Sequence, residues 1–327
     1  MKRISLLIII CFCLLLSGCS LKQEKEYKLN LYYMDTYIYV DFFCNNKEQA
    51  EAMKTSIDSI YESYHKLSDR YNEYDDIINI YSIHNNDRKD DYLVLDPKLY
   101  DLLEYSLEFQ KMTNNRFNIE IGGIIDVWKK YRELGEGIPN VKELKTADKR
   151  NKLVLLGDNK IKNNHPNLDL GAISKGYATE KVGKYLEEQG ITKYLINAGG
   201  NVKVGLPNNK DYYRVGIQSP NKDGSLVTIV KGKNISVVTS GSYERNYTYQ
   251  GKTYSHIIDP STLYPAEFMK SVTVITEDSA IGDLLSTTLF LMNVDDGLEF
   301  IKNYNAEAIW VTNNDELIRS EGFSSYE

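Results

Sequence analysis

Cysteine is scarce in this chain, and its placement excludes two ways of stabilising a fold. The 327 residues include four cysteines, and three of them, at positions 11, 13 and 19, lie in or just after an N-terminal apolar segment. Cys44 alone remains for the body of the chain. A single cysteine can neither close an internal disulfide nor supply a cysteine pair to a zinc site. The body is long enough for a sizeable core, in one large domain or two lobes.

Several familiar catalytic motifs are absent as well. The chain has no G-x-S-x-G nucleophile elbow, no H-E-x-x-H zinc helix and no G-x-G-x-x-G dinucleotide loop. Residues 171–176 read GAISKG, which places Lys and Gly in the wrong order for a P-loop. The chemistries that depend on these motifs are therefore excluded.

Positive charge is also in the minority. Lys and Arg number 39 against 46 Asp and Glu, which gives a formal net charge of −7 at pH 7. If residues 1–18 are removed, Lys2 and Arg3 leave with them and the net charge becomes −9. This balance argues against a nucleic-acid partner and against a polybasic patch for a membrane surface.

The N-terminus contains the longest apolar run. After Lys2 and Arg3, residues 5–16 are apolar over about a dozen positions, whereas a membrane-spanning helix needs about 20. Residues 1–18 are therefore predicted to be a signal peptide. Its end, Leu16-Ser17-Gly18-Cys19, has the small residues before cysteine that a lipoprotein signal peptidase accepts.

We expect a diacylglyceryl group on the thiol of Cys19. Residues 19–27 are then the lipidated cysteine and a polar tether, and residues 28–327 form the folded domain. Two or three lipid chains hold a protein on a membrane stably, whereas one chain does so only marginally. The predicted location is the cell membrane, lipid-anchored on its extracytoplasmic face. An ordinary signal peptide followed by a chance cysteine is the alternative.

Hydrophobic periodicity predicts a mixture of helices and short strands. Residues 28–43 alternate as strand material with a turn near Met34, and apolar residues from Ala50 to Leu67 recur every three or four positions, as in a helix. Further helices are expected from Asp96-Pro97, over 173–189 before Gly190, and from Asp278 to Met292. Short strands are expected at 193–197, 213–218, 226–231, 235–239, 253–258 and 307–311, with a hairpin turn at Gln250-Gly251 and a surface excursion over 141–165. Long helices in the first half and short strands in the second predict an α+β fold with mixed, largely antiparallel sheets.

Two glycine-containing segments follow predicted strands. In residues 168–177, LDLGAISKGY, an apolar strand end meets Gly171 and a helix begins, so free N–H groups there favour a phosphate. Asp169 is placed to accept hydrogen bonds from a ring or a ribose. In residues 197–201, NAGGN, paired glycines permit a ligand to approach the backbone closely. A plain turn with packing glycines is the alternative at both places.

Two further segments carry side chains suited to proton transfer and to metal binding. His256, one of four histidines, stands between strand residues and a turn at Asp259-Pro260, where an imidazole suits proton transfer near neutral pH. Asp283 and Thr287 are four residues apart, so they share one helix face, with Ile281 and other apolar residues opposite. A carboxylate and a hydroxyl are oxygen ligands that suit Mg²⁺. A structural histidine, and an Asp favoured by the helix dipole, are the alternatives.

Together these segments resemble the ApbE family, the FAD:protein FMN transferases. The motifs LDLGAISKGYA, INAGGNV, VVTSGSYER, YSHIIDPSTLYP and DLLSTTLF occur in the order seen in that family. Met34-Asp35-Thr36, Lys66-Leu67-Ser68 before Tyr71-Asn72, and residues 115–120 leading into Val127-Trp128 fit the same pattern. The resemblance spans roughly residues 31–320, and five linked motifs in register are far more specific than any one of them.

The resemblance implies an ApbE-like fold and an enzyme that uses Mg²⁺ to cleave FAD, transfers FMN to a threonine of an acceptor flavoprotein and releases AMP. It places at FAD-contacting positions Met34, Tyr71, Phe117, Asn118, Ile119, Asp169, Lys175 and Ile258. It places Mg²⁺ at the Ala172 carbonyl, Asp283 and Thr287, and assigns catalysis to His256 and Asp283. With the predicted anchor, the acceptor is expected to be a membrane redox-complex subunit or an extracellular flavoprotein.

Three positions depart from the family pattern. Asn118 stands where Asp is usual, Ser255 where a second histidine is frequent, and Leu263 where a glycine follows threonine. The departures put one flavin contact and the loop beside His256 in question, and they leave the Mg²⁺ positions in place. Two other functions remain open: a Mg²⁺-dependent FAD pyrophosphatase that gives free FMN and AMP, and a non-catalytic flavin- or solute-binding lipoprotein.

Overall fold

The computed structural model describes residues 24–148 and 151–327. Cys19 and the predicted signal peptide lie outside these residues, so their role stays a prediction. The first strand begins at Lys25, which places the last three residues of the expected tether in the folded domain. Within the described ranges, no helix has the length and apolar character needed to cross a membrane.

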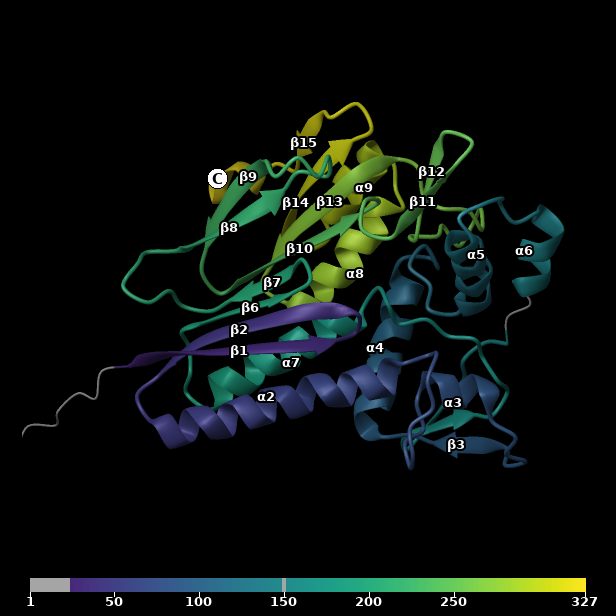
Figure 1. Ribbon diagram of the computed structural model, residues 1–327, viewed down its shortest axis with the longest axis horizontal. Coiled ribbons are helices and arrows are strands. Elements are labelled where there is room, and N and C mark those ends of the chain that lie inside the picture. The colour runs from purple at the N-terminus through teal and green to yellow at the C-terminus, as the bar shows by residue number, and fades with distance from the viewer. Residues whose placement is uncertain (1–23, 149–150) are drawn as a thin grey trace, which may run out of the picture.

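An eight-stranded sheet runs through the middle of the molecule (Figure 1). Its strands are, in spatial order, β1 (Lys25–Tyr33), β2 (Thr36–Cys44), β6 (Tyr194–Ala198), β7 (Asn201–Val204), β10 (Ile235–Gly241), β13 (Met269–Thr276), β14 (Ala306–Thr312) and β15 (Leu317–Arg319). Each neighbouring pair is antiparallel. The predicted α+β class with antiparallel sheets is confirmed, and the sheet joins the N-terminal hairpin to strands from the second half of the chain.

Three helices pack along one face of this sheet: α2 (Lys47–Ser68), α7 (Ser174–Glu188) and α8 (Ser279–Phe290) (Figure 1). Helix α2 begins at Asn46, whose side chain accepts hydrogen bonds from the backbone N–H groups of Glu48 and Gln49. Its apolar stripe, from Ala50 to Leu67, is buried as the three-to-four spacing predicts. Helix α8 begins after Asp278, which caps it as expected.

The other face of the sheet is covered in its second half. The hairpin of β8 (Tyr213–Gln218) and β9 (Leu226–Gly232) and the 3₁₀ helix η1 (Phe323–Tyr326) pack there. Val215, Val230 and Phe323 form a second hydrophobic cluster with residues of the sheet strands. On the helical side, α9 (Val294–Ile301) packs on α8 and β14.

The remaining elements lie beside one end of the sheet, on the right in Figure 1. They are α3 (Ile80–Asn85), β3 (Tyr92–Val94), α4 (Pro97–Met112), α5 (Gly122–Leu134), α6 (Val141–Ala147), β4 (Leu155–Gly157), β5 (Lys160–Lys162), β11 (Asn246–Tyr249) and β12 (Lys252–Ser255). Trp128 on α5 stacks on Tyr254 of β12 with ring centroids 5.6 Å apart, and its Nε1–H donates to the Leu263 carbonyl at 2.8 Å. These contacts join α5 to the loop that carries His256.

The structure differs from the sequence-based expectations in several details, among them strand β13 and helix α5, which the periodicity did not predict. Residues 141–165, expected to be a surface excursion, contain α6 and the β4–β5 hairpin, because Leu144 and Ile161 are buried within an otherwise charged stretch. The strand expected over 253–258 ends at Ser255, so His256 stands in a loop. The predicted turn at Gln250-Gly251 is confirmed, with φ of 49° and 78°.

Candidate active site

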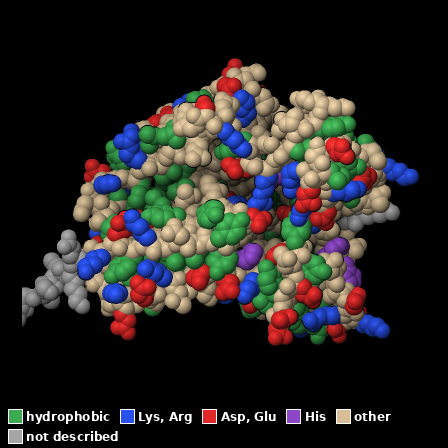
Figure 2. Space-filling view, in the orientation of Figure 1, with side chains coloured by type: hydrophobic (Ala, Val, Ile, Leu, Met, Phe, Trp, Pro, Cys, Tyr) green, Lys and Arg blue, Asp and Glu red, His purple; other side chains and the backbone are tan. Residues whose placement is uncertain are grey.

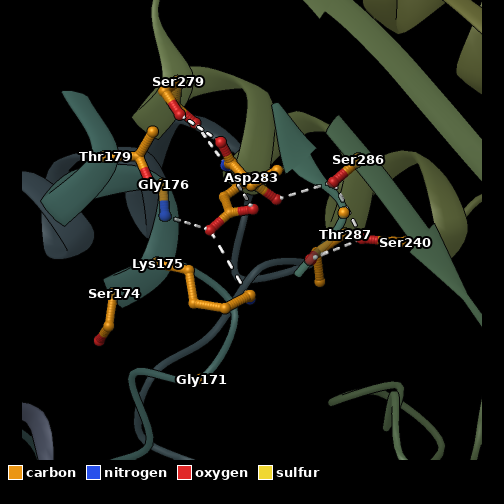
Figure 3. Close-up of polar contacts among 12 residues, drawn as sticks. Gly171, Ser174, Lys175, Gly176, Thr179, Ser240, Ser279, Asp283, Ser286 and Thr287 are labelled. Atoms are coloured by element: carbon orange, nitrogen blue, oxygen red, sulfur yellow. Dashed lines mark hydrogen bonds and ion pairs between the residues drawn. The ribbon is translucent and has the colours of Figure 1, made fainter. Parts of the chain in front are cut away.

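Helices α7 and α8 meet at a buried carboxylate. Asp283, on α8, is 6% exposed. Its Oδ2 accepts a hydrogen bond from the backbone N–H of Gly176 at 2.6 Å, and its Oδ1 accepts one from Nδ2 of Asn201 at 3.1 Å. The ammonium of Lys175 lies 3.9 Å from Oδ2. Figure 3 shows the carboxylate pointing from α8 toward the first turn of α7. Residues that are far apart in the sequence therefore hold the Asp283 carboxylate in one orientation.

Asp283 acts as the N-terminal cap that α7 lacks. The N-cap position is occupied by Ile173, whose side chain makes no capping hydrogen bond. Gly176 is the third residue of α7, where a backbone N–H has no intrahelical partner. The Asp283 carboxylate accepts from this N–H at the positive end of the helix dipole. Helix α7 therefore offsets part of the cost of burying the charge.

The missing side chain of Gly176 permits this close approach. A Cβ there would lie 2.8 Å from the side chain of Asp283. We expect Gly176→Ala to push α7 and α8 apart and lower the free energy of unfolding by about 1–3 kcal/mol, as overpacking does. Denaturant titration measures this. Gly216→Ala is the control, because its added Cβ would meet only the flexible end of Leu226. Equal unfolding midpoints for the two variants would contradict the tight contact.

The oxygen atoms around Asp283 suit a divalent cation. Burial raises the pKa of the Asp283 carboxyl, and the donors around it, with Lys175 foremost, lower it only in part. A bound cation would remove this penalty. The Thr287 hydroxyl lies one turn further along α8, 3.3 Å from Oγ of Ser240, and Ala172 lies in the turn before α7. Hard oxygen donors of this kind fit Mg²⁺.

Clusters of acidic, histidine or cysteine side chains are the usual metal sites in proteins. In the part of the chain that the structure describes, no group of three or more His, Cys, Asp or Glu side chains could hold a metal ion. A site at Asp283 would therefore depend on one carboxylate, a hydroxyl and backbone oxygen, as the sequence predicts. Such a set leaves coordination positions for water and for substrate phosphate oxygens.

A buried network fixes the orientation of Asn201. The Ser279 hydroxyl donates to Oδ1 of Asn201 at 2.5 Å, which directs the amide N–H groups toward Asp283. The backbone N–H of Ser279 donates to Glu180 at 2.8 Å, and Glu180 pairs with Lys203 at 2.9 Å. The sequence singled out the segment NAGGN and gave Asn201 no role; the structure shows it to be a direct partner of Asp283.

The surroundings of α8 differ from the sequence-based expectation in one respect. Asp283 was expected on a polar face opposite Ile281 and other apolar residues. Asp283 is buried, whereas Ile281 is partly exposed, because α8 is covered by α7, β10 and β13 on nearly all sides. The alternative that Asp283 is a surface carboxylate favoured only by the helix dipole is therefore wrong.

His256 lies in a positive environment. Its Nδ1 is buried and has no hydrogen-bond partner among the described residues. Burial, together with the positive charges of Arg245, Arg132 and Lys175, lowers the pKa of His256 to about 4. The imidazole is therefore neutral at pH 7, which is the form that accepts a proton. Figure 2 shows Lys and Arg side chains beside the hollow between the sheet and the part with α5 and β12, and such a charge suits a phosphate.

Asp169 and Ile119, two of the predicted FAD positions, lie side by side. The backbone N–H of Asp169 donates to the Ile119 carbonyl at 2.8 Å. Oδ1 of Asp169 accepts from the backbone N–H of Gly171 at 2.8 Å, and Oδ2 accepts from Arg70 at 3.2 Å. The guanidinium carbon of Arg70 also lies 5.2 Å from the ring centroid of Tyr71. Arg70 therefore connects two predicted positions, and sequence analysis did not single it out.

The other predicted FAD positions differ in how much surface they present. Phe117, Ile119 and Ile258 are 2%, 1% and 5% exposed, so they present little surface to a ligand. The Asn118 side chain closes a turn by accepting from the backbone N–H of Glu120 at 2.8 Å. Met34 stands at the β1–β2 turn with φ of 53°. All these assignments remain predictions.

A surface hollow of about 480 Å³ lies elsewhere, between α5 and α6. Its walls include Val127, Glu143 and Ala147 and none of the predicted site residues. Its lining contains no imidazole and none of the residues of the quoted motifs, so we place the candidate site at the α7–α8 contact instead.

Comparison with known proteins finds matches to one family. The model of the ApbE family matches residues 34–310. A FAD:protein FMN transferase of Klebsiella pneumoniae (strain 342) is 32% identical over 231 residues, which cover 68% of this chain and 71% of that protein. A FAD:protein FMN transferase of Vibrio cholerae is 24% identical over 325 residues, which cover 96% of this chain and 95% of that protein.

Solved structures share the architecture. The ApbE protein from Thermotoga maritima matches with a TM-score of 0.81 and 25% identity, over 93% of this chain and 99% of that one. The flavin transferase ApbE from Vibrio cholerae matches with a TM-score of 0.76 and 20% identity, over 93% of this chain and 100% of that one. The arrangement of sheet and helices around Asp283 thus belongs to a fold seen in both proteins.

Proposed function

The chain belongs to the ApbE family, and we propose that it transfers FMN from FAD to a threonine of an acceptor flavoprotein and releases AMP. The observation that carries this proposal is that one cation, Lys175, lies beside a buried carboxylate, Asp283, and also acts on a neutral imidazole, His256. The relatives named FAD:protein FMN transferase support the same activity.

The residues divide the reaction between them. The threonine oxygen attacks the phosphorus on the FMN side of the pyrophosphate, a new P–O bond forms, and the bond to the AMP oxygen breaks. His256 accepts the proton of the hydroxyl, because its pKa of about 4 keeps it unprotonated at pH 7. Lys175 and Arg245 offset the negative charge of the phosphates. The backbone around Gly171 lets the substrate approach closely.

Asp283, Thr287 and the Ala172 carbonyl are the residues that would hold Mg²⁺. When bound, Mg²⁺ supplies Lewis-acid polarisation of the pyrophosphate and stabilises the departing AMP oxygen. The chain contributes a preformed carboxylate, which Gly176 and Asn201 keep in one orientation. A fixed ligand of this kind loses little entropy when a cation binds.

Mass spectrometry tests the proposed activity. The full chain in detergent is mixed with FAD, Mg²⁺ and an apo-flavoprotein produced in cells that cannot attach flavin. We expect an FMN-sized mass gain on an acceptor threonine, with one AMP released for each FMN attached. Release of AMP and free FMN without that gain would identify a pyrophosphatase. Binding of FAD without either product would identify a flavin-binding protein.

We further propose that the chain is lipid-anchored through Cys19 on the extracytoplasmic face of the cell membrane. The support is the Leu16–Cys19 sequence and the absence of any later apolar run of about 20 residues. This location would bring the site close to membrane redox complexes and extracellular flavoproteins, which are the acceptors we propose.

Cys19→Ala tests the anchor. The variant removes the thiol that would carry the lipid, so we expect it to leave the membrane fraction while it retains the wild-type specific activity. Fractionation after a high-salt wash, followed by an immunoblot, measures this. Cys44→Ala is the matched control, and it should stay with the membrane because Cys44 is buried within the fold. A Cys19→Ala protein that remains in washed membranes would contradict the anchor.

A further inference from the structure

Arg70 follows helix α2 and is buried beside the candidate site. Its side chain is 9% exposed, and its guanidinium makes three hydrogen bonds. Nη1 donates to Oδ2 of Asp169 at 3.2 Å, and Nη2 donates to Asp126 at 2.9 Å and to Oδ1 of Asn167 at 2.8 Å. The planar fork of arginine suits several acceptors at once, whereas lysine offers a single point charge.

The two carboxylates that contact Arg70 are not equivalent. The Asp169 side chain is 16% exposed, whereas the Asp126 side chain is 45% exposed. Ion pairs that are mostly exposed contribute little, because water screens them. The Nη2 atom that Asp126 contacts also donates to Asn167. Without Asp126, the hydrogen bonds from Nη1 to Asp169 and from Nη2 to Asn167 would remain and would still fix Arg70. Without Arg70, the Asp169 carboxylate would lose the hydrogen bond to its Oδ2.

Asp169 keeps acceptor capacity for a ligand. A carboxylate has about four lone-pair positions. One position on Oδ1 accepts from the backbone N–H of Gly171, and one on Oδ2 accepts from Arg70. These two bonds, on different oxygens, fix the plane of the carboxylate. The remaining lone pairs can accept from ring N–H or ribose O–H groups of a flavin nucleotide.

We propose that Arg70 is a positioning residue for FAD binding, which presets the Asp169 carboxylate and supports the Tyr71 ring without touching the substrate. The proposal rests on the proposed function, because it takes FAD as the ligand. Both Nη atoms donate to protein acceptors, and Nε, which has no partner among the described residues, is buried, so Arg70 does not face a substrate phosphate. Its effect reaches the ligand through Asp169 and Tyr71.

Titration calorimetry of the full chain with FAD tests the proposal without turnover, in EDTA and again with Mg²⁺ but no acceptor. We expect Arg70→Met to raise the Kd for FAD by about 10- to 100-fold, the range for a lost hydrogen bond to a charged group. Arg70→Lys keeps the positive charge but loses the planar guanidinium, so its Kd for FAD should lie between the values of the wild type and of Arg70→Met. Asp126→Asn is the matched control, and its Kd should stay within about twofold of the wild-type value.

Kinetics separates positioning from a merely structural role. For Arg70→Lys, the KM for FAD should rise while kcat at saturating FAD stays within about threefold of wild type. The reason is that a loosely held Asp169 weakens FAD binding, whereas bound FAD holds the carboxylate in place during the reaction. Wild-type Kd for FAD in both arginine variants would overturn the proposal. If Arg70→Met does not fold, Arg70→Lys decides alone. Failure of the wild-type chain to bind FAD would instead refute the proposed function.

Discussion

Asp283→Asn is expected to leave a folded protein that has lost nearly all FMN transfer, with turnover reduced by about 10²-fold or more. Asparagine keeps the shape of the side chain but removes the charge that would pair with Mg²⁺. The predicted FAD contact through Asp169 does not involve that charge, because Asp169 is held by Arg70 and the backbone N–H of Gly171, so FAD binding should persist. Excess Mg²⁺ should restore part of the activity by mass action. Turnover assays over a Mg²⁺ series measure both effects.

Thermal unfolding gives a second readout that does not depend on activity. Because burial raises the pKa of Asp283 above its unfolded value, the apo protein gains stability from this group below pH 4 and loses it as pH rises through the folded pKa. Mg²⁺ reverses the loss at neutral pH, where the carboxylate is charged. We therefore expect Mg²⁺ to raise the Tm of the wild type at pH 7 and to leave the Tm of Asp283→Asn nearly unchanged.

Asp278→Asn is the control for this experiment. Asp278 precedes the same helix, and its replacement is chemically identical. Its side chain caps α8, a role that asparagine fills equally well, and its one ion pair, 3.9 Å from the exposed ammonium of Lys184, is screened by water. It should keep the wild-type activity and the Mg²⁺-dependent shift in Tm. A fully active Asp283→Asn with an unchanged Mg²⁺ requirement would falsify the metal assignment.

Elements with strong local signals could be predicted from the sequence. The apolar spacing from Ala50 to Leu67 and the cap at Asp278 located two helices correctly. The prediction of a turn at Gln250-Gly251 was correct because Gly251 adopts a positive φ without strain. Where apolar residues were few, as over 141–165, the pattern was too weak to reveal a short helix and a hairpin.

The surroundings of the site residues could not be predicted, because they come from distant segments. Gly176 is 107 positions from Asp283, and no local pattern indicates that a backbone N–H caps one helix with the carboxylate of another. Arg70 looks like an ordinary charged residue after a helix, yet it bonds Asp169 across 99 positions. Linked motifs in the sequence can indicate which residues share a function. How deeply those residues are buried, and which residues they bond, can be seen only in the folded structure.

His256 illustrates the same limit, since its neighbours set its charge. Its unperturbed pKa would make it half protonated near pH 6.5. The buried Nδ1 and the cations around the ring lower that pKa to about 4, so the base is available throughout the neutral range. Among these cations, Arg245 forms part of the quoted motif VVTSGSYER, but the sequence did not indicate that it faces the histidine.

We expect His256→Ala to lower kcat by about 10²- to 10⁴-fold with little change in the KM for FAD, because a base acts mainly in the transition state. His84→Ala is the matched control. His84 lies on α3 and bonds the His165 carbonyl, so its loss should leave transfer intact. Transfer by His256→Ala at the wild-type rate at neutral pH would show that the histidine is structural and that the base lies elsewhere.

The activity and the stability should both depend on pH through the titration of His256. Because the folded pKa of His256 is lowered, its neutral form and the stability it contributes are present above pH 6.5 and are lost as pH falls through about 4. The wild-type kcat/KM should therefore fall with acid in the range near pH 4, and His256→Ala should lack that fall. The unfolding free energy of the variant should also depend less on pH between 4 and 6.5. An identical acid profile in both proteins would assign the titration to another group, since only His256 is changed.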